Sequence, residues 1–211
     1  NLKQPASGGY NTTNVTSSLS CKANYKKDAT TWTNSLDLNY GFIQSAQQKG
    51  LIRKNVDQMY LQSNLAFQVK KNAKWNYSAK YTFKSQFTNT FTYGTPKEDQ
   101  TWKDVATKAS GFLSPAYTNL ALGIKWVPSK WMTMNIAPFT ADFTIVTDTL
   151  IRKKYSMPVY KKYESESKKL NYMYKPSRFS FGATVTTDLN FKVNDLFNIT
   201  SQVVLFSNYL D

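Results

Sequence analysis

The chain has 211 residues, with 27 lysines and arginines against 13 acidic residues, and its net charge of +14 favours polyanionic partners. It contains no histidine and one cysteine, which excludes histidine-dependent catalysis, an internal disulfide and a thiolate metal cluster. A mean hydropathy of -0.51 and the lack of a long apolar run exclude a transmembrane helix, but not a membrane barrel with a polar interior.

Two alternating segments joined by a tight turn open the chain. Residues 15–25 place Val15, Leu19 and Tyr25 on one face and serine, lysine and asparagine side chains on the other. After a polar turn at residues 26–29, residues 32–42 alternate in the same way. Alternation with period two is typical of a strand with one apolar face, so these segments predict a β-hairpin.

The segment KWNYSAKYTFKSQFT, residues 74–88, shows this alternation most clearly. Every second side chain from Trp75 to Phe83 is aromatic or alanine, and lysines and small polar residues occupy the other face. Such a segment is longer than the usual strand of about five or six residues. A strand of about ten residues rises roughly 33 Å, enough to span an outer membrane at the usual tilt.

The rest of the chain repeats this pattern. Further strands are predicted at residues 58–69, 119–126, 132–145, 178–191 and 197–209. Within residues 132–145 the apolar face changes parity at Ala137 and Pro138, which predicts a β-bulge because proline cannot donate to the strand ladder. The chain thus holds eight predicted strands.

The predicted connections alternate between short and long. Short turns are expected at residues 26–29, 71–73, 128–130 and 193–195, and long loops at residues 45–54, 93–112 and 148–176. Outer-membrane barrels combine short turns at one end with long loops at the other. We therefore predict an all-β, antiparallel up-and-down transmembrane β-barrel as a single domain over residues 1–211. A soluble ligand-binding barrel that buries the apolar face is the alternative.

Charged residues on the predicted polar faces are the first candidate functional group. The residues predicted to face the lumen are Lys22, Asp37, Lys80, Lys84, Lys125, Arg178 and Asp188. They have two interpretations: a salt-bridged plug that fills a narrow barrel, or a cationic pathway for anions.

The last long loop is the second candidate. Its basic residues are Arg152, Lys153, Lys154, Lys161, Lys162, Lys168 and Lys169. A solvated mobile loop is one interpretation, and a surface for lipopolysaccharide phosphates or an acidic partner is the other. Nucleic acid is not expected, because the strand aromatics lie on the face opposite the lysines, where bases could not stack beside bound phosphates.

Several segments together resemble a known family. They are TTWTNSLDLNYG (residues 30–41), FLSPAYTNLALGIKWVP (residues 112–128), MNIAPFTADFTIV (residues 134–146) and LFSNYLD (residues 205–211), with the ASGG stretch at residues 6–9. The chain resembles a Bacteroidota family of outer-membrane β-barrels known as a domain of unknown function. The resemblance implies the outer membrane of a Gram-negative bacterium and assigns no catalytic residue.

The resemblance and the residues lead to one set of expectations. The family pattern extends beyond both ends of the chain, so we expect an incomplete domain from a native barrel of ten to twelve strands. We expect no enzymatic activity, no cofactor and no metal site. The expected function is an accessory or structural subunit of an outer-membrane assembly, in contact with outer-membrane lipid, lipopolysaccharide and other outer-membrane proteins. The alternative is a narrow porin-like channel for small anionic solutes.

Overall fold

The computed structural model describes residues 11–70, 74–165, 170–192, 194 and 196–210, and most of them lie in β-strands. The strands of the main sheet are β1 (Thr12–Lys27), β2 (Thr30–Ser45), β3 (Ile52–Gln68), β4 (Trp75–Ser85), β7 (Ala116–Ser129), β8 (Met132–Ile145), β11 (Ser177–Lys192) and β12 (Asn198–Asn208). The only helical element assigned within these residues is a 3-10 turn, η1 (Ala46–Gln48). No helix in the described part of the chain has the length and apolarity needed to cross a membrane.

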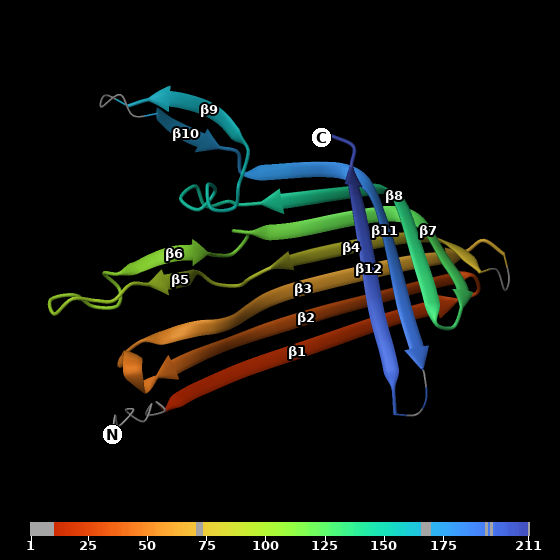
Figure 1. The fold of residues 1–211 in the computed structure, drawn as a ribbon, viewed down its shortest axis with the longest axis horizontal. Helices are drawn as coiled ribbons and strands as arrows, with labels where there is room; N and C mark the ends of the chain where they lie inside the picture. The colour runs from red at the N-terminus through yellow and green to blue at the C-terminus, as the bar shows by residue number, and fades with distance from the viewer. Residues whose placement is uncertain (1–10, 71–73, 166–169, 193, 195, 211) are drawn as a thin grey trace, which may run out of the picture.

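The main sheet is an antiparallel meander in which each strand pairs with the next one along this series. It holds eight strands, which confirms the predicted all-β up-and-down arrangement. The short turns lie at one end and the long connections at the other, as Figure 1 shows. We call these ends the short-turn rim and the loop end. The predicted turns at residues 71–73, 193 and 195 lie outside the described residues.

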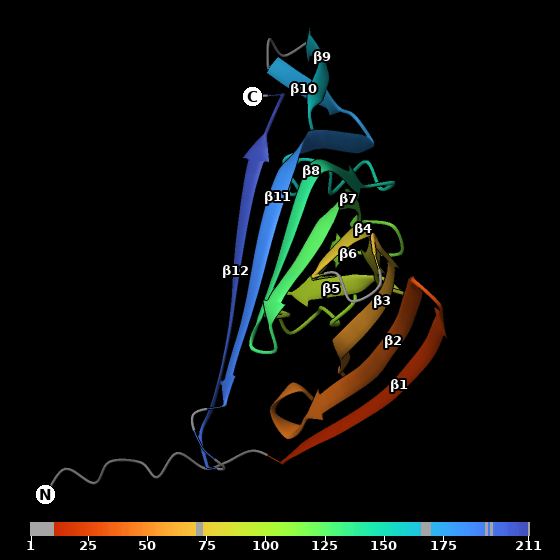
Figure 2. The ribbon, with the colours of Figure 1, turned by 90° about the vertical axis from the view of Figure 1, so that its right-hand side faces the viewer.

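The sheet curls into an open trough and does not close into a barrel (Figure 2). Within the described residues β1 and β12 form the two edges, and no ladder joins them. The eight strands expected from the sequence are thus present, and they do not by themselves form a closed barrel. Alternation along a strand determines which face each side chain takes, but it carries no information about whether the first and last strands meet.

Two further hairpins lie at the loop end, in segments that the sequence analysis treated as irregular. One pairs β5 (Thr90–Tyr93) with β6 (Ala106–Ser110), and the other pairs β9 (Val159–Glu164) with β10 (Leu170–Tyr174). Each is a separate two-stranded sheet that extends beyond the main sheet (Figure 1). These strands are only four to six residues long, too short for the alternation of side chains to identify them.

The register joins the apolar side chains of successive strands into one continuous face. Pairs that lie opposite each other are Leu19 and Leu38, Leu61 and Phe83, Tyr77 and Ile124, Leu122 and Phe139, and Phe143 and Phe179. This face is open: Val15 is 57% exposed, Phe139 59% and Leu205 63%. A soluble barrel, the alternative interpretation, would bury this face, whereas in this structure its side chains are exposed.

Bulges and strand-interior glycines occur together. The predicted bulge is confirmed, since Ala137 and Pro138 of β8 together lie opposite Gly123 of β7. The pairing also shifts next to Gly41 in β2 and next to Gly182 in β11. A Cβ added to Gly123 or Gly182 would lie 2.0 Å from a backbone carbonyl oxygen of the neighbouring strand. Bulges bend and twist a sheet, and only glycine permits the close approach of the backbones at these two points.

Candidate functional site

The concave face of the trough is polar and encloses a central hollow of about 420 Å³. Residues from seven strands line this central hollow, among them Thr33, Asn64, Lys80, Lys125, Asn135, Asp188 and Gln202. Side chains of β2 and β12 can line one hollow only on the concave side of the curled sheet (Figure 2). Three of the charged residues predicted to face a lumen, Lys80, Lys125 and Asp188, are therefore brought together here.

Carboxylates on the polar face accept hydrogen bonds from neutral side chains. Ser20 donates to Asp37 at 2.6 Å, and Gln202 donates to Asp188 at 2.6 Å. Asp142, which the sequence analysis did not select, accepts a hydrogen bond of 2.7 Å from Asn119. The ion pairs found among the described residues are Lys54 with Asp57 and Lys108 with Asp148, so the lysines of the central hollow are not neutralised by a direct ion pair.

The remaining predicted lumen residues are spread along the same face. Lys22 lines a separate hollow of about 130 Å³ with residues of β1, β2 and β3. Lys84 lines a hollow of about 240 Å³ at the loop end, beside Tyr117 and Tyr155. Arg178 donates a hydrogen bond of 3.4 Å to the carbonyl of Ser156. The sequence thus identified a shared face, and the structure divides its charges among several hollows.

The basic residues of the last long loop have different surroundings: some are hydrogen-bonded to backbone carbonyls and others are exposed. Arg152 donates hydrogen bonds of 3.0, 3.1 and 2.9 Å to the carbonyls of Val146, Tyr174 and Thr147, which makes it a structural anchor of the loop. Lys154 donates to the carbonyl of Ala109 at 3.2 Å. Lys153, Lys161 and Lys162 are exposed, and Lys168 and Lys169 lie outside the described residues.

The loop end holds the buried apolar cluster of the chain's described part. Val146, Ile151 and Met157 form it, with Tyr155 and Tyr174 packed against it. Burial is the main reason why the pKa of Tyr155 is raised above its ordinary value, and the nearby Tyr117 adds to the effect. Residues 146–157 therefore form a packed segment, whereas a mobile loop was one of the two predicted interpretations.

Polar contacts connect the long connections with one another. Asp148 pairs with Lys108 at 2.6 Å, and this hydrogen bond is the largest cause of the lowered pKa of Asp148. Tyr155 donates a hydrogen bond of 3.2 Å to the carbonyl of Ala109. Trp102, between β5 and β6, donates to the carbonyl of Lys49 at 3.1 Å. The three long connections thus form one platform at the loop end.

An ion pair near the start of β3 holds the segment that follows β4. Asp57 accepts hydrogen bonds from the backbone N–H groups of Phe87 at 2.8 Å and Thr88 at 3.0 Å, and it pairs with Lys54. Lys54 in turn donates to the carbonyl of Thr88 at 2.7 Å. The side chain of Asp57 is 2% exposed. In the sequence, the only sign of this pair is a carboxylate three residues after a lysine at the start of a strand, and the pair was not among the predicted sites.

Tryptophans gather at the short-turn rim on the apolar face. Trp75 stacks on Trp126 with ring centroids 5.3 Å apart, and Trp131 stacks on Phe191 at 4.6 Å. Trp32 donates its indole N–H to Ser63 at 2.9 Å. Aromatic side chains at the ends of membrane-spanning strands form girdles at the level of the lipid headgroups.

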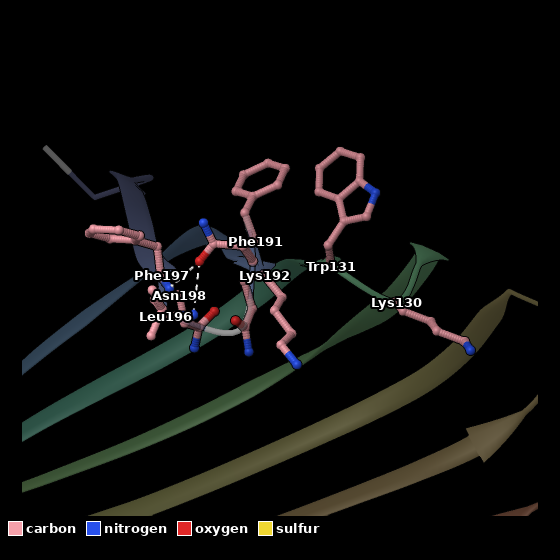
Figure 3. A pocket seen from close by; sticks show the side chains of 9 residues that line it. Lys130, Trp131, Phe191, Lys192, Leu196, Phe197 and Asn198 are labelled. Atoms are coloured by element: carbon pink, nitrogen blue, oxygen red, sulfur yellow. Dashed lines mark hydrogen bonds between the residues drawn. The ribbon is translucent and has the colours of Figure 1, made fainter.

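Side chains at this rim divide between the two sides of the sheet. Figure 3 shows the rings of Trp131 and Phe191 together on one side of the ribbon, with Lys130 and Lys192 extending on the other. These residues line a hollow of about 600 Å³ together with Leu196, Phe197 and neighbouring asparagines. The rim thus presents rings outward and lysines toward the concave side.

Comparison with known proteins adds a family without an assigned function. Residues 1–91 match the family model described as a protein of unknown function (DUF3078). This match covers β1 to β4 and the start of β5, and it confirms the predicted resemblance to a domain of unknown function. No curated protein and no solved structure matches the chain. Within the described residues, no group of three or more histidine, cysteine, aspartate or glutamate side chains could hold a metal ion.

Proposed function

We propose that this chain is a non-enzymatic part of the wall of a β-barrel in the outer membrane of a Gram-negative bacterium of the Bacteroidota. In this proposal it serves as a structural subunit of an outer-membrane assembly. The single observation that supports it is the exposed apolar face, to which all eight strands of the sheet contribute. Soluble monomeric proteins rarely expose contiguous apolar patches of more than a few hundred Å².

The dimensions of the apolar face fit a bilayer. On β11 this face runs from Phe179 to Phe191, which is about 40 Å along the strand at the usual rise per residue. At a tilt of about 45° this length spans about 28 Å along the membrane normal, close to the thickness of a hydrocarbon core. The stacked tryptophans at the short-turn rim then lie at one interface.

The two edges support the role as a subunit. All residues of β1 are exposed, and so are all residues of β12 except the last. Unpaired backbone groups cannot face hydrocarbon, because no water is present to satisfy them. Both edges must therefore pair with further strands in a membrane, and strands of a neighbouring outer-membrane protein are the partners we propose.

Quenching by brominated lipids tests membrane insertion. Variants that keep a single tryptophan at Trp75, Trp131 or Trp102 are reconstituted into vesicles of phospholipid brominated on the acyl chain. We expect strong quenching of Trp75 and Trp131 and weak quenching of Trp102, which lies in the connection between β5 and β6. Equal, weak quenching at all three positions would refute the membrane proposal.

The second candidate is a narrow channel for small anionic solutes. It is favoured by the central hollow, where Lys80 and Lys125 have no direct carboxylate partner among the described residues. In a salt-bridged plug, by contrast, each of these lysines would pair with an acidic side chain. Single-channel conductance in planar bilayers tests this candidate, because a plugged interior gives no steady openings.

A further inference from the structure

Three lysines of the concave face lie at regular intervals along β4 and β7. Lys80 and Lys84 are four residues apart on β4, and Lys125 of β7 lies opposite Asn76, four residues before Lys80. Side chains four residues apart on a strand share a face and are about 13 Å apart. Lys125, Lys80 and Lys84 therefore form three levels of one row, which we call the lysine file.

Each level of the lysine file opens into a hollow. Lys125 and Lys80 line the central hollow, and Lys80 also lines the next hollow, of about 280 Å³. Lys84 lines the hollow at the loop end. The hollows follow one another along β7, since their linings include Lys125, then Asn119 and then Tyr117. Lys130 and Lys192 line the hollow at the short-turn rim, where a solute would enter or leave.

The surroundings of the lysine file favour oxyanions. Asn64 and Asn135 in the central hollow carry amide N–H groups that can donate hydrogen bonds. The nearby carboxylates of Asp142 and Asp188 accept hydrogen bonds from neutral donors. Asp57, which lines the hollow of Lys84, pairs with Lys54, and no ion pair with the file is found among the described residues. An ammonium group beside neutral donors matches a phosphate or sulfate ion, which carries charge and several acceptor oxygens.

We propose that the lysine file is a row of binding sites along which small oxyanions cross the barrel, with inorganic phosphate as the representative ligand. This proposal rests on the channel candidate above and specifies its solute and its residues. The separation of about 13 Å exceeds the Debye length of about 8 Å at physiological salt, so an anion at one level leaves the next level free to bind. An ion can then pass from level to level without being trapped at one deep site.

The direct test is anion selectivity in planar bilayers. With the partner strands that complete the barrel, we expect the protein to give openings whose reversal potential in a potassium chloride gradient lies toward the chloride equilibrium potential. We also expect inorganic phosphate to reduce the chloride current. Each of Lys80→Gln and Lys125→Gln should lower the anion-to-cation permeability ratio about fivefold, the effect of removing one unit charge about 4 Å away in water. Lys161→Gln and Lys162→Gln on the exposed hairpin are the matched controls and should leave the ratio unchanged.

A second measurement does not depend on insertion. Phosphorus NMR of inorganic phosphate, titrated with the protein folded in detergent micelles, should show line broadening that the double variant Lys80→Gln/Lys125→Gln abolishes. Two results would overturn the oxyanion proposal and leave the membrane proposal standing. One is an inserted protein that does not prefer anions over cations, and the other is a double variant whose anion-to-cation permeability ratio is unchanged. Protein that fails to insert counts against the membrane proposal, and an unbroadened phosphate line in micelles then overturns the oxyanion proposal as well.

Discussion

Ser78 of β4 donates a hydrogen bond of 2.8 Å to Asn135 of β8, although the whole of β7 lies between these strands. Gly123 is the β7 residue opposite Ser78, and its missing side chain leaves the space that this bond crosses. The bulge at Ala137 brings the backbone of β8 against the same glycine. The curvature of the sheet at this point therefore depends on a single residue without a Cβ.

Gly123→Ala should destabilise the fold strongly. The new Cβ would lie 2.0 Å from the carbonyl oxygen of Ile136 and 2.5 Å from the Cα of Ala137, and backbone atoms cannot move away cheaply. We expect a loss of about 3 kcal/mol in the free energy of unfolding, measured by denaturant titration in micelles. Gly94→Ala is the control, since its Cβ would meet Val105 at an ordinary 3.7 Å and should change stability by less than about 0.5 kcal/mol. Equal effects of the two changes would contradict this account.

Asp57→Ala should release the segment after β4 from β3. The change leaves the almost buried ammonium of Lys54 without its carboxylate and removes the acceptor for the N–H groups of Phe87 and Thr88. Breaking one partner of such a pair costs about 3 kcal/mol. We expect this loss in denaturant titration, together with faster proteolysis at residues 86–89. Asp99→Ala, in an exposed part of the β5–β6 connection, is the control, and an equally large effect there would refute the role of Asp57.

The only cysteine reports on the orientation of β1. Cys21 is exposed, and its position on β1 lies opposite Leu36, within the apolar face. In intact vesicles we expect a charged, membrane-impermeant maleimide to leave Cys21 unmodified, because the reagent does not enter hydrocarbon. Lys22→Cys in a Cys21→Ser background places the thiol on the polar face and should be labelled. Labelling of Cys21 as fast as that of the Lys22→Cys variant would contradict the proposed lipid-facing surface.

The contact between the β5–β6 hairpin and residues 146–157 should weaken in acid. The hydrogen bond from Lys108 is the largest cause of the lowered pKa of Asp148, so folding favours the charged carboxylate. Its stabilising effect is therefore complete above the unfolded pKa of about 3.9 and is lost as the pH falls through the lower folded value. Spin labels at Thr107→Cys and Lys153→Cys in a Cys21→Ser background should give a narrow distance distribution at pH 7 that broadens below about pH 4.

Asp148→Asn supplies the comparison for this experiment. Its neutral amide cannot form the ion pair with Lys108 at 2.6 Å, so the distance distribution should be broad at every pH. A distribution for the native pair that stays narrow in acid would show that the apolar cluster around Ile151 holds the loop by itself.

The sequence by itself determined the eight strands, the two faces of the sheet and the asymmetry of the connections. Period-two alternation is a local property, and it survives in the structure because adjacent strands pair like face with like face, as Leu19 does with Leu38. The parity change at Pro138 likewise located a bulge correctly, since proline cannot continue a ladder.

Only the tertiary structure decided how these strands are assembled. Whether β1 meets β12, that Asp57 holds Thr88 and that Arg152 binds the carbonyl of Tyr174 all depend on contacts between residues far apart in sequence. Contacts on the concave face could not be predicted either. Alternation placed Lys80 and Lys125 on the polar side, but only the structure shows whether acidic side chains neutralise them. Register and curvature set those distances, and both arise from bulges and from glycines such as Gly123 whose role becomes visible only when the neighbouring strand is in place.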